Sequence, residues 1–269
     1  MPDLLYEKRD GVAILTLNRP DHRNAFSPEM MVLLAEAWVD FRDDDDLRVA
    51  VLTGAGDQAF CAGGDLGRLM PLFTGAREPE DDWDRRLMSD AGQVMSIALL
   101  RPFELYKPII SAINGYAVAG GTEILQSTEI RIASTNSSFG LSEAQRGLVP
   151  AGGSMVRLPR QIPYCKAMEI LLTGDRISAE EALRIGFVNE VVAPDELLPR
   201  AFQFADRLAR NAPLALRAIK EAVLRTSGLP LEEAYGIEFE LAASVMSSRD
   251  AREGPKAFME KRDPVFTGN

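Results

Sequence analysis

One stretch near the middle of the chain constrains its fold more than any other. The apolar run 109–113 leads into Asn114-Gly-Tyr-Ala-Val-Ala-Gly-Gly-Thr-Glu123, and Ile124-Leu125 follow. A short buried strand, then small residues, then an acidic residue predicts a tight strand-to-helix turn, with the helix beginning near Glu123. The backbone N–H groups at such a helix start are unpaired and carry positive potential. The turn can therefore hold a developing negative charge.

A plainer interpretation of this stretch is that Gly120 and Gly121 only allow close packing, with Glu123 as an ordinary first-turn acid. A second stretch of the same character is Ala59-Phe-Cys-Ala-Gly-Gly-Asp-Leu66, and taken alone it predicts no more than a turn with an aspartate cap. Either stretch in isolation favours the packing role. Two of them in one chain make a shared site worth testing.

Composition excludes several classes of function. A net charge of −10 and a pI near 4.8 argue against nucleic acid as a partner, because binding phosphates requires a basic face. The single histidine, His22, leaves no material for a His-rich zinc site and little for a Ser-His-Asp nucleophile. Any proton chemistry is therefore expected to fall to carboxylates, and no metal is expected.

The two cysteines, Cys61 and Cys165, form no metal or redox motif, which favours a reducing compartment. No segment has the length and apolarity of a signal peptide or membrane span. We therefore expect a cytoplasmic protein with no membrane partner.

The pattern along the chain predicts an α/β core followed by helices. Ser27 and Pro28 are a typical cap and first residue for a helix over 28–41. The loop 147–154 is rich in glycine but lacks the lysine of a phosphate-binding loop. Residues 67–107 are mixed, with a helix over 83–100, and are expected to form the mobile wall of any pocket. The remaining predicted strands are 11–18, 48–53, 109–113 and 129–134, and the remaining predicted helices are 164–173, 178–185, 195–210, 213–226 and 231–247.

Taken together, these stretches resemble the crotonase family, the enoyl-CoA hydratase/isomerase superfamily. The resemblance covers nearly the whole chain, and its motifs are Asn18-Arg-Pro with Asn24-Ala25, Phe60-Cys-Ala-Gly-Gly-Asp-Leu66, Lys107-Pro108, Asn114 to Glu123, Phe139-Gly with Glu143, Gly147-Leu-Val-Pro-Ala-Gly-Gly153, and Leu172-Thr-Gly-Asp-Arg-Ile-Ser178. The fold it implies is an α/β core of ββα turns with two roughly perpendicular sheets. Residues 1–195 would form this core, and 196–269 a helical trimerisation region, giving homotrimers or dimers of trimers.

The resemblance also implies a site and a reaction. The N–H groups of Ala62 and Gly120 would form an oxyanion hole for the thioester carbonyl of an acyl-CoA, and losing one such donor typically costs about 10²–10³ in rate. Glu123 and Glu143 match the two glutamates of hydratases. Glu123 would hold and activate the water that attacks Cβ, and Glu143 would contact that water and supply the proton to Cα. No cofactor is implied beyond the coenzyme A of the substrate.

Contacts to coenzyme A are carried over by the same resemblance. Asp65 has an alternative role, as the cap that orients the Ala62 loop, and Arg23 and Lys261 have the alternative of being solvated surface charges. Phe258 and Lys261 would reach the site from a neighbouring subunit. The implied contacts are Arg23, Ala25, Ala62, Gly63, Gly64, Asp65, Leu66, Tyr116, Gly121, Phe258 and Lys261.

Departures from the family pattern leave the acyl group open. Ala119 replaces a common glycine, Ser142 replaces a common proline, and segment 67–107 is longer than usual. The C-terminal end, residues 253–266, is similar to the carnitinyl-CoA dehydratase branch, which uses the same pair of glutamates. The leading expectation is an enoyl-CoA hydratase (a hydro-lyase) of fatty-acid β-oxidation. The alternatives are carnitinyl-CoA dehydratase, enoyl-CoA isomerase, and a non-catalytic protein that binds CoA or RNA.

Overall fold

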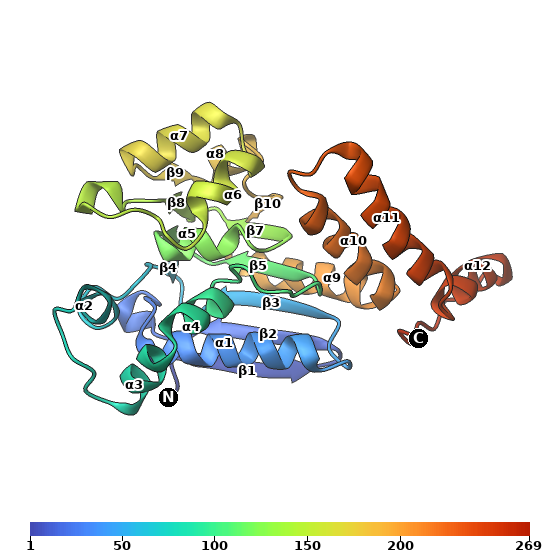
Figure 1. Cartoon of the computed structure of the whole chain (residues 1–269), viewed down its shortest axis with the longest axis horizontal. Coiled ribbons are helices and arrows are strands. Elements are labelled where there is room, and N and C mark those ends of the chain that lie inside the picture. The colour runs from blue at the N-terminus through green and yellow to red at the C-terminus, as the bar shows by residue number, and fades with distance from the viewer.

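The computed structural model describes residues 1–269 and contains two β-sheets (Figure 1). The larger sheet has six strands in the order β1-β2-β3-β5-β7-β10, and only β1 and β2 pair antiparallel. Its strands are β1 (Leu4–Arg9), β2 (Val12–Leu17), β3 (Val49–Gly54), β5 (Ile109–Ile113), β7 (Ile130–Ser134) and β10 (Glu190–Val192).

The smaller sheet consists of very short strands, in the order β4-β6-β8-β9. The first three of these are parallel and β9 is antiparallel to β8. The strands are β4 (Ala59–Cys61), β6 (Tyr116–Val118), β8 (Ser138–Gly140) and β9 (Ile177–Ser178). Along the chain, a strand of the larger sheet is followed by one of the smaller sheet and then by a helix, as in β5, β6 and α5 (Gly120–Leu125). The predicted α/β fold with repeated ββα turns is confirmed.

Helices cover both faces of the larger sheet. In β3, Val49 and Val51 pack with α9 (Leu197–Ala209), whereas Ala50 and Leu52 belong to the main core beneath α1 (Pro28–Asp43). This alternation follows from the two-residue period of a strand. The Ser27 hydroxyl accepts a hydrogen bond from Met30 N at 3.1 Å and so caps α1 as predicted.

The segment expected to form one helix over 83–100 forms two, which corrects that prediction. These are α3 (Asp82–Ser89) and α4 (Ala91–Ala98), which follow the short α2 (Leu69–Thr74). Asp90 separates them, because its side chain accepts a hydrogen bond from Gln93 N at 3.2 Å and starts a new helix. Apolar content in the sequence gave no sign of this cap.

The C-terminal half is helical, as predicted, with two helices that the sequence analysis missed. The predicted helices correspond to α7 (Tyr164–Thr173), α8 (Ala179–Arg184), α9, α10 (Pro213–Thr226) and α11 (Leu231–Met246); α6 (Ser154–Gln161) and α12 (Asp250–Glu260) were not predicted. Figure 1 shows α10, α11 and α12 extending away from the sheets, whereas α9 packs on the larger sheet. The proposed boundary at 195/196 stays a prediction. None of the helices is both long enough and apolar enough to cross a membrane.

Candidate active site

The three parallel strands of the smaller sheet end at one edge, and the predicted site residues follow those ends directly. Ala62 follows β4, Gly120 comes two residues after β6, and Glu143 comes three residues after β8. Side chains and backbone groups at the carboxyl ends of neighbouring parallel strands converge on one place. The fold thus brings together residues that are widely separated in the sequence.

Gly63 and Gly120 are in direct contact across this edge. A Cβ added to Gly63 would lie 3.2 Å from Gly120 N, and a Cβ added to Gly120 would lie 3.7 Å from Gly63 Cα and 3.1 Å from the Phe26 ring. The N–H groups of Gly120 and Gly121 donate to no acceptor in the protein. Unpaired donors at a helix start, left bare by small residues, are available to an oxyanion.

The other predicted donor, the Ala62 N–H, has a partner within the chain. It donates to the Arg23 carbonyl at 3.0 Å. Arg23 and Asn24 both adopt left-handed backbone, with φ of 56° and 54°. The buried Asn24 side chain fixes this turn by donating to the carbonyls of Ala55 and Ala59 at 2.9 and 2.8 Å. The role of Ala62 in an oxyanion hole stays a prediction.

Glu123 lies in the first turn of α5 and is only 5% exposed. Its Oε1 accepts a hydrogen bond from Ser154 N at 3.2 Å, at the start of α6. Burial raises the pKa of the Glu123 carboxyl, although the hydrogen bonds from Ser154 and Gly152 act in the opposite direction. The result is a buried carboxyl that is held in one orientation and whose ionised form is a stronger base than an exposed carboxylate.

Glu143 directly precedes a short 3-10 helix (Ala144–Arg146) and is 9% exposed. Its Oε2 is buried and has no hydrogen-bond partner. Burial, with a smaller contribution from the negative charge of Glu123, raises the pKa of Glu143 to about 7. A carboxyl with a pKa near neutral pH is suited to general acid–base catalysis.

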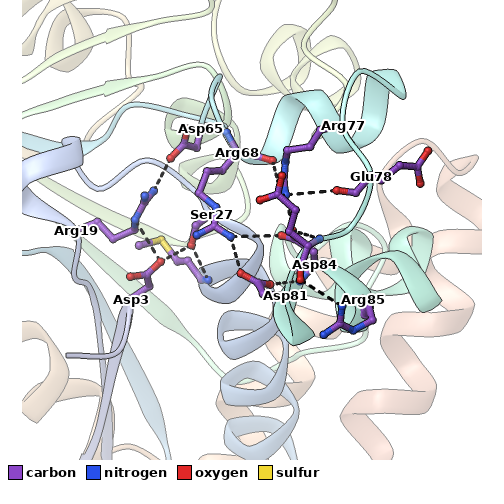
Figure 2. Close-up of polar contacts among 12 residues, drawn as sticks. Asp3, Arg19, Ser27, Asp65, Arg68, Arg77, Glu78, Asp81, Asp84 and Arg85 are labelled. Atoms are coloured by element: carbon purple, nitrogen blue, oxygen red, sulfur yellow. Dashed lines mark hydrogen bonds and ion pairs between the residues drawn. The ribbon is translucent and has the colours of Figure 1, made fainter.

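The segment after the second glycine stretch packs against the backbone of that stretch. Met70 Sδ would lie 3.3 Å from a Cβ on Gly64, so this side chain packs onto the glycine backbone. Leu66 and Phe73 are 64% and 39% exposed nearby in sequence. Ion pairs of Arg68 and Arg77 with Asp81 and Asp84 fasten the segment to α3 (Figure 2).

The remaining predicted contacts divide into two groups. Arg23, Ala25 and Tyr116 lie on the segments that lead into the site, and the Tyr116 ring is covered by the Arg176 guanidinium at 4.9 Å. Phe258 is 85% exposed and Lys261 is also exposed; both lie on or just after α12, which Figure 1 shows far from β4 and β6. Within one chain the structure does not bring this second group to the site.

Three residues of the site were given no role in the sequence analysis. Gly152 and Ser154 form the surroundings of the Glu123 carboxylate, and Arg19 holds Asp65 with a distance of 2.9 Å between Nη1 and Oδ2. The Gly-Gly-Ser sequence at 152–154 could have indicated a binding position for a carboxylate, because small residues before a helix leave its first N–H groups open. Nowhere do three or more His, Cys, Asp or Glu side chains gather in a way that could hold a metal ion.

Comparisons with known proteins show which family this chain is similar to. The model of a family described as enoyl-CoA hydratase/isomerase matches residues 7–269. The chain is 44% identical to enoyl-CoA hydratase EchA19 of Mycobacterium tuberculosis, covering 98% of this chain and 96% of the relative. It is 41% identical to carnitinyl-CoA dehydratase of Salmonella agona over the full length of both. A solved enoyl-CoA hydratase from Mycobacterium tuberculosis superposes with a TM-score of 0.88 at 37% identity, with complete coverage of both chains.

Proposed function

This chain belongs to the enoyl-CoA hydratase/isomerase family, and on that basis we propose that it adds water across the 2,3 double bond of an enoyl-CoA thioester. The observation that carries the proposal is the pair of buried carboxyls, Glu123 and Glu143, beside the free N–H of Gly120. Two acid–base groups suit the addition of water, whereas an isomerase that only moves one proton needs a single carboxylate.

In this proposal the thioester carbonyl accepts hydrogen bonds from Gly120 N–H and Ala62 N–H. These donors stabilise the enolate oxygen as water bonds to Cβ. Glu123, fixed by Ser154 N, orients the water and takes one of its protons. Glu143, which has a pKa of about 7, gives a proton to Cα. Proton exchange between the two carboxyls then restores the starting state, so that water alone is consumed and no further cofactor takes part.

For the acyl group of the substrate we propose a chemical class. Relatives named enoyl-CoA hydratase and carnitinyl-CoA dehydratase both match the whole chain at more than 40% identity. A second candidate is therefore hydration of crotonobetainyl-CoA, whose acyl group carries a positive charge. The enoyl-CoA hydratase relative is the more similar of the two, at 44% against 41% identity, so we take the simple enoyl-CoA as the leading substrate.

We also propose that the chain assembles as a homotrimer or a dimer of trimers. Helix α11 has no buried residue, and its large apolar side chains are open to solvent, as in Tyr235 (62% exposed) and Phe239 (76% exposed). An apolar face of this kind is typical of an interface. In that assembly Phe258 and Lys261 would reach the coenzyme A of a neighbouring subunit. Sedimentation should give three or six times 29.5 kDa, and a stable monomer would contradict the assembly.

The hydratase is tested by the loss of enoyl-thioester absorbance with crotonyl-, hexenoyl-, decenoyl- and crotonobetainyl-CoA. Glu123→Gln and Glu143→Gln should each lower kcat by about 10²–10⁴. The exposed glutamate Glu7, replaced by glutamine, is the control and should leave kcat unchanged. Turnover like that of the parent in the Glu143→Gln enzyme would overturn the two-carboxyl mechanism. Conversion of a 3-enoyl-CoA without hydration would indicate an isomerase.

A further inference from the structure

An arginine with a largely buried side chain lies next to the loop that carries Ala62. Arg19 follows β2, and its side chain is 9% exposed. Its Nη1 donates to Asp65 Oδ2 at 2.9 Å and to the Ala25 carbonyl at 2.7 Å, and its Nε lies 3.2 Å from Asp3 Oδ2 (Figure 2). One guanidinium therefore joins the N-terminal strand region to the segment 25–26 and to the loop after β4.

Both oxygens of the Asp65 carboxylate accept hydrogen bonds. Its second oxygen, Oδ1, accepts from Gly67 N at 2.9 Å and from Arg68 N at 3.1 Å. Burial alone would raise the pKa of Asp65, but the hydrogen bonds from Arg19, Gly67 and Arg68 hold it below its ordinary value. Both carboxylate oxygens accept hydrogen bonds from protein donors, so the Asp65 side chain is in position to hold the loop.

The backbone of the loop is attached to the same segment. Phe26 N donates to the Gly63 carbonyl at 2.8 Å, and Asp65 N donates to the Phe26 carbonyl at 2.9 Å. Gly63 in turn contacts Gly120 across the site. A movement of the loop relative to segment 25–26 would therefore change the spacing between the Ala62 and Gly120 N–H groups.

We propose that Arg19 is a positioning residue that sets the spacing of the two oxyanion donors by holding Asp65 and the Ala25 carbonyl at once. This inference rests on the proposed function. A planar guanidinium suits the task because it presents several donors in a fixed arrangement, which a lysine ammonium cannot reproduce. A misplacement of about 1 Å at a catalytic group typically costs about 10²-fold in rate.

The test uses Arg19→Met, Arg19→Lys and Asp65→Asn. Asp65→Asn keeps an oxygen for Gly67 N and Arg68 N but loses the charge that pairs with Arg19, so it decides the question even if Arg19→Met fails to fold. Arg86→Gln is the control, because it breaks an exposed ion pair with Glu36 (side chains 47% and 54% exposed) on the neighbouring α3. We expect kcat to fall about 10²-fold in Arg19→Met and Asp65→Asn with KM little changed, a smaller loss in Arg19→Lys, and no change in Arg86→Gln.

A spectroscopic measurement separates positioning from general loss of stability. Each substitution is combined with Glu143→Gln, and the absorption of bound cinnamoyl-CoA is recorded, because donors at the carbonyl polarise the conjugated thioester and shift its band to longer wavelength. The Glu143→Gln parent should show the shift, and the Arg19→Met and Asp65→Asn combinations should show a smaller one at saturating ligand. An unchanged shift and unchanged kcat in folded Asp65→Asn would overturn the positioning role. A parent that binds cinnamoyl-CoA without any shift would overturn the proposed oxyanion hole and this inference with it.

Discussion

Glu123 Oε2 lies 2.6 Å from the point where Gly152 would carry a Cβ, so the carboxylate occupies the space that a side chain at 152 would need. Leu99 Cδ1 lies 3.0 Å from the same point and closes the other side. The absence of a side chain at Gly152 therefore leaves the space that the Glu123 carboxylate occupies. Residue 152 determines where Glu123 can point, although it contributes no reactive group.

Gly152→Ala should displace this carboxylate. We expect kcat for hydration to fall about 10²-fold, because the added methyl group forces Glu123 away from its position. Gly92→Ala is the matched control, since nothing lies within 4 Å of its added Cβ; it lies within α4 and should stabilise the protein by up to about 1 kcal/mol. Steady-state kinetics and thermal unfolding of both variants check this, and undiminished activity in Gly152→Ala would contradict the arrangement.

Glu143 should reduce stability above neutral pH. Its pKa rises from 4.5 to about 7 in the native chain, mainly through burial. Between these values the native state keeps a proton that the unfolded chain has released, so the free energy of unfolding falls as pH rises through this window. Glu143→Gln should be more stable than the parent by about 1–3 kcal/mol at pH 8 and equally stable at pH 4. Urea unfolding at both pH values measures this difference, and equal stability at pH 8 would contradict it.

Lys220 should hold α10 to the core. Its Nζ is buried, donates to the Lys107 carbonyl at 2.9 Å and lies 3.0 Å from Glu129 Oε1. Lys220→Met leaves these acceptors without a donor and should lower the free energy of unfolding by about 2–4 kcal/mol. Arg225→Gln breaks a more exposed pair on the same helix and should change it by less than about 1 kcal/mol. Equal effects of the two substitutions in urea unfolding would count against the buried pair.

The two cysteines should react very differently with thiol reagents. Burial raises the pKa of Cys61 to about 12, whereas Cys165 is exposed on α7. Because only the thiolate is nucleophilic, one thiol per chain should react with a disulfide reagent in the native protein and two in denaturant. Cys165→Ser should abolish the native reaction. Rapid modification of both thiols in the native state would show that Cys61 in β4 becomes accessible to solvent.

The strongly patterned parts of the fold were predictable from the sequence, and the parts fixed by distant partners were not. The strand at 109–113 and the cap at Ser27 depend on nearby residues and were predicted correctly. The strands β4, β6 and β8 are three residues long, too short for a period to be recognised, and pair with segments far along the chain. The sequence therefore gave no account of the smaller sheet from periodicity alone.

The same division applies to the site. Glu123 and Glu143 could be named from the resemblance to a family, but the burial that raises their pKa values comes from segments that fold over them. Arg19 was recognised only as part of the Asn18-Arg-Pro motif and given no role, because its partners Asp3 and Asp65 lie on opposite sides of it in the sequence. The residues that act through others are the ones that local patterns do not reveal.

The hydrogen bond between Ala62 N–H and the Arg23 carbonyl has a consequence for selectivity. A neutral thioester oxygen that takes over this donor exchanges one uncharged acceptor for another, so the exchange gains little free energy. An enolate oxygen makes a charge-assisted hydrogen bond, which is roughly twice as strong as a neutral one. Under the proposed function, the Arg23 carbonyl competes with the thioester oxygen for the Ala62 N–H. The neutral substrate oxygen binds this N–H about as well as the Arg23 carbonyl does, whereas the enolate oxygen binds it better. The Ala62 N–H therefore distinguishes the enolate from the substrate by charge.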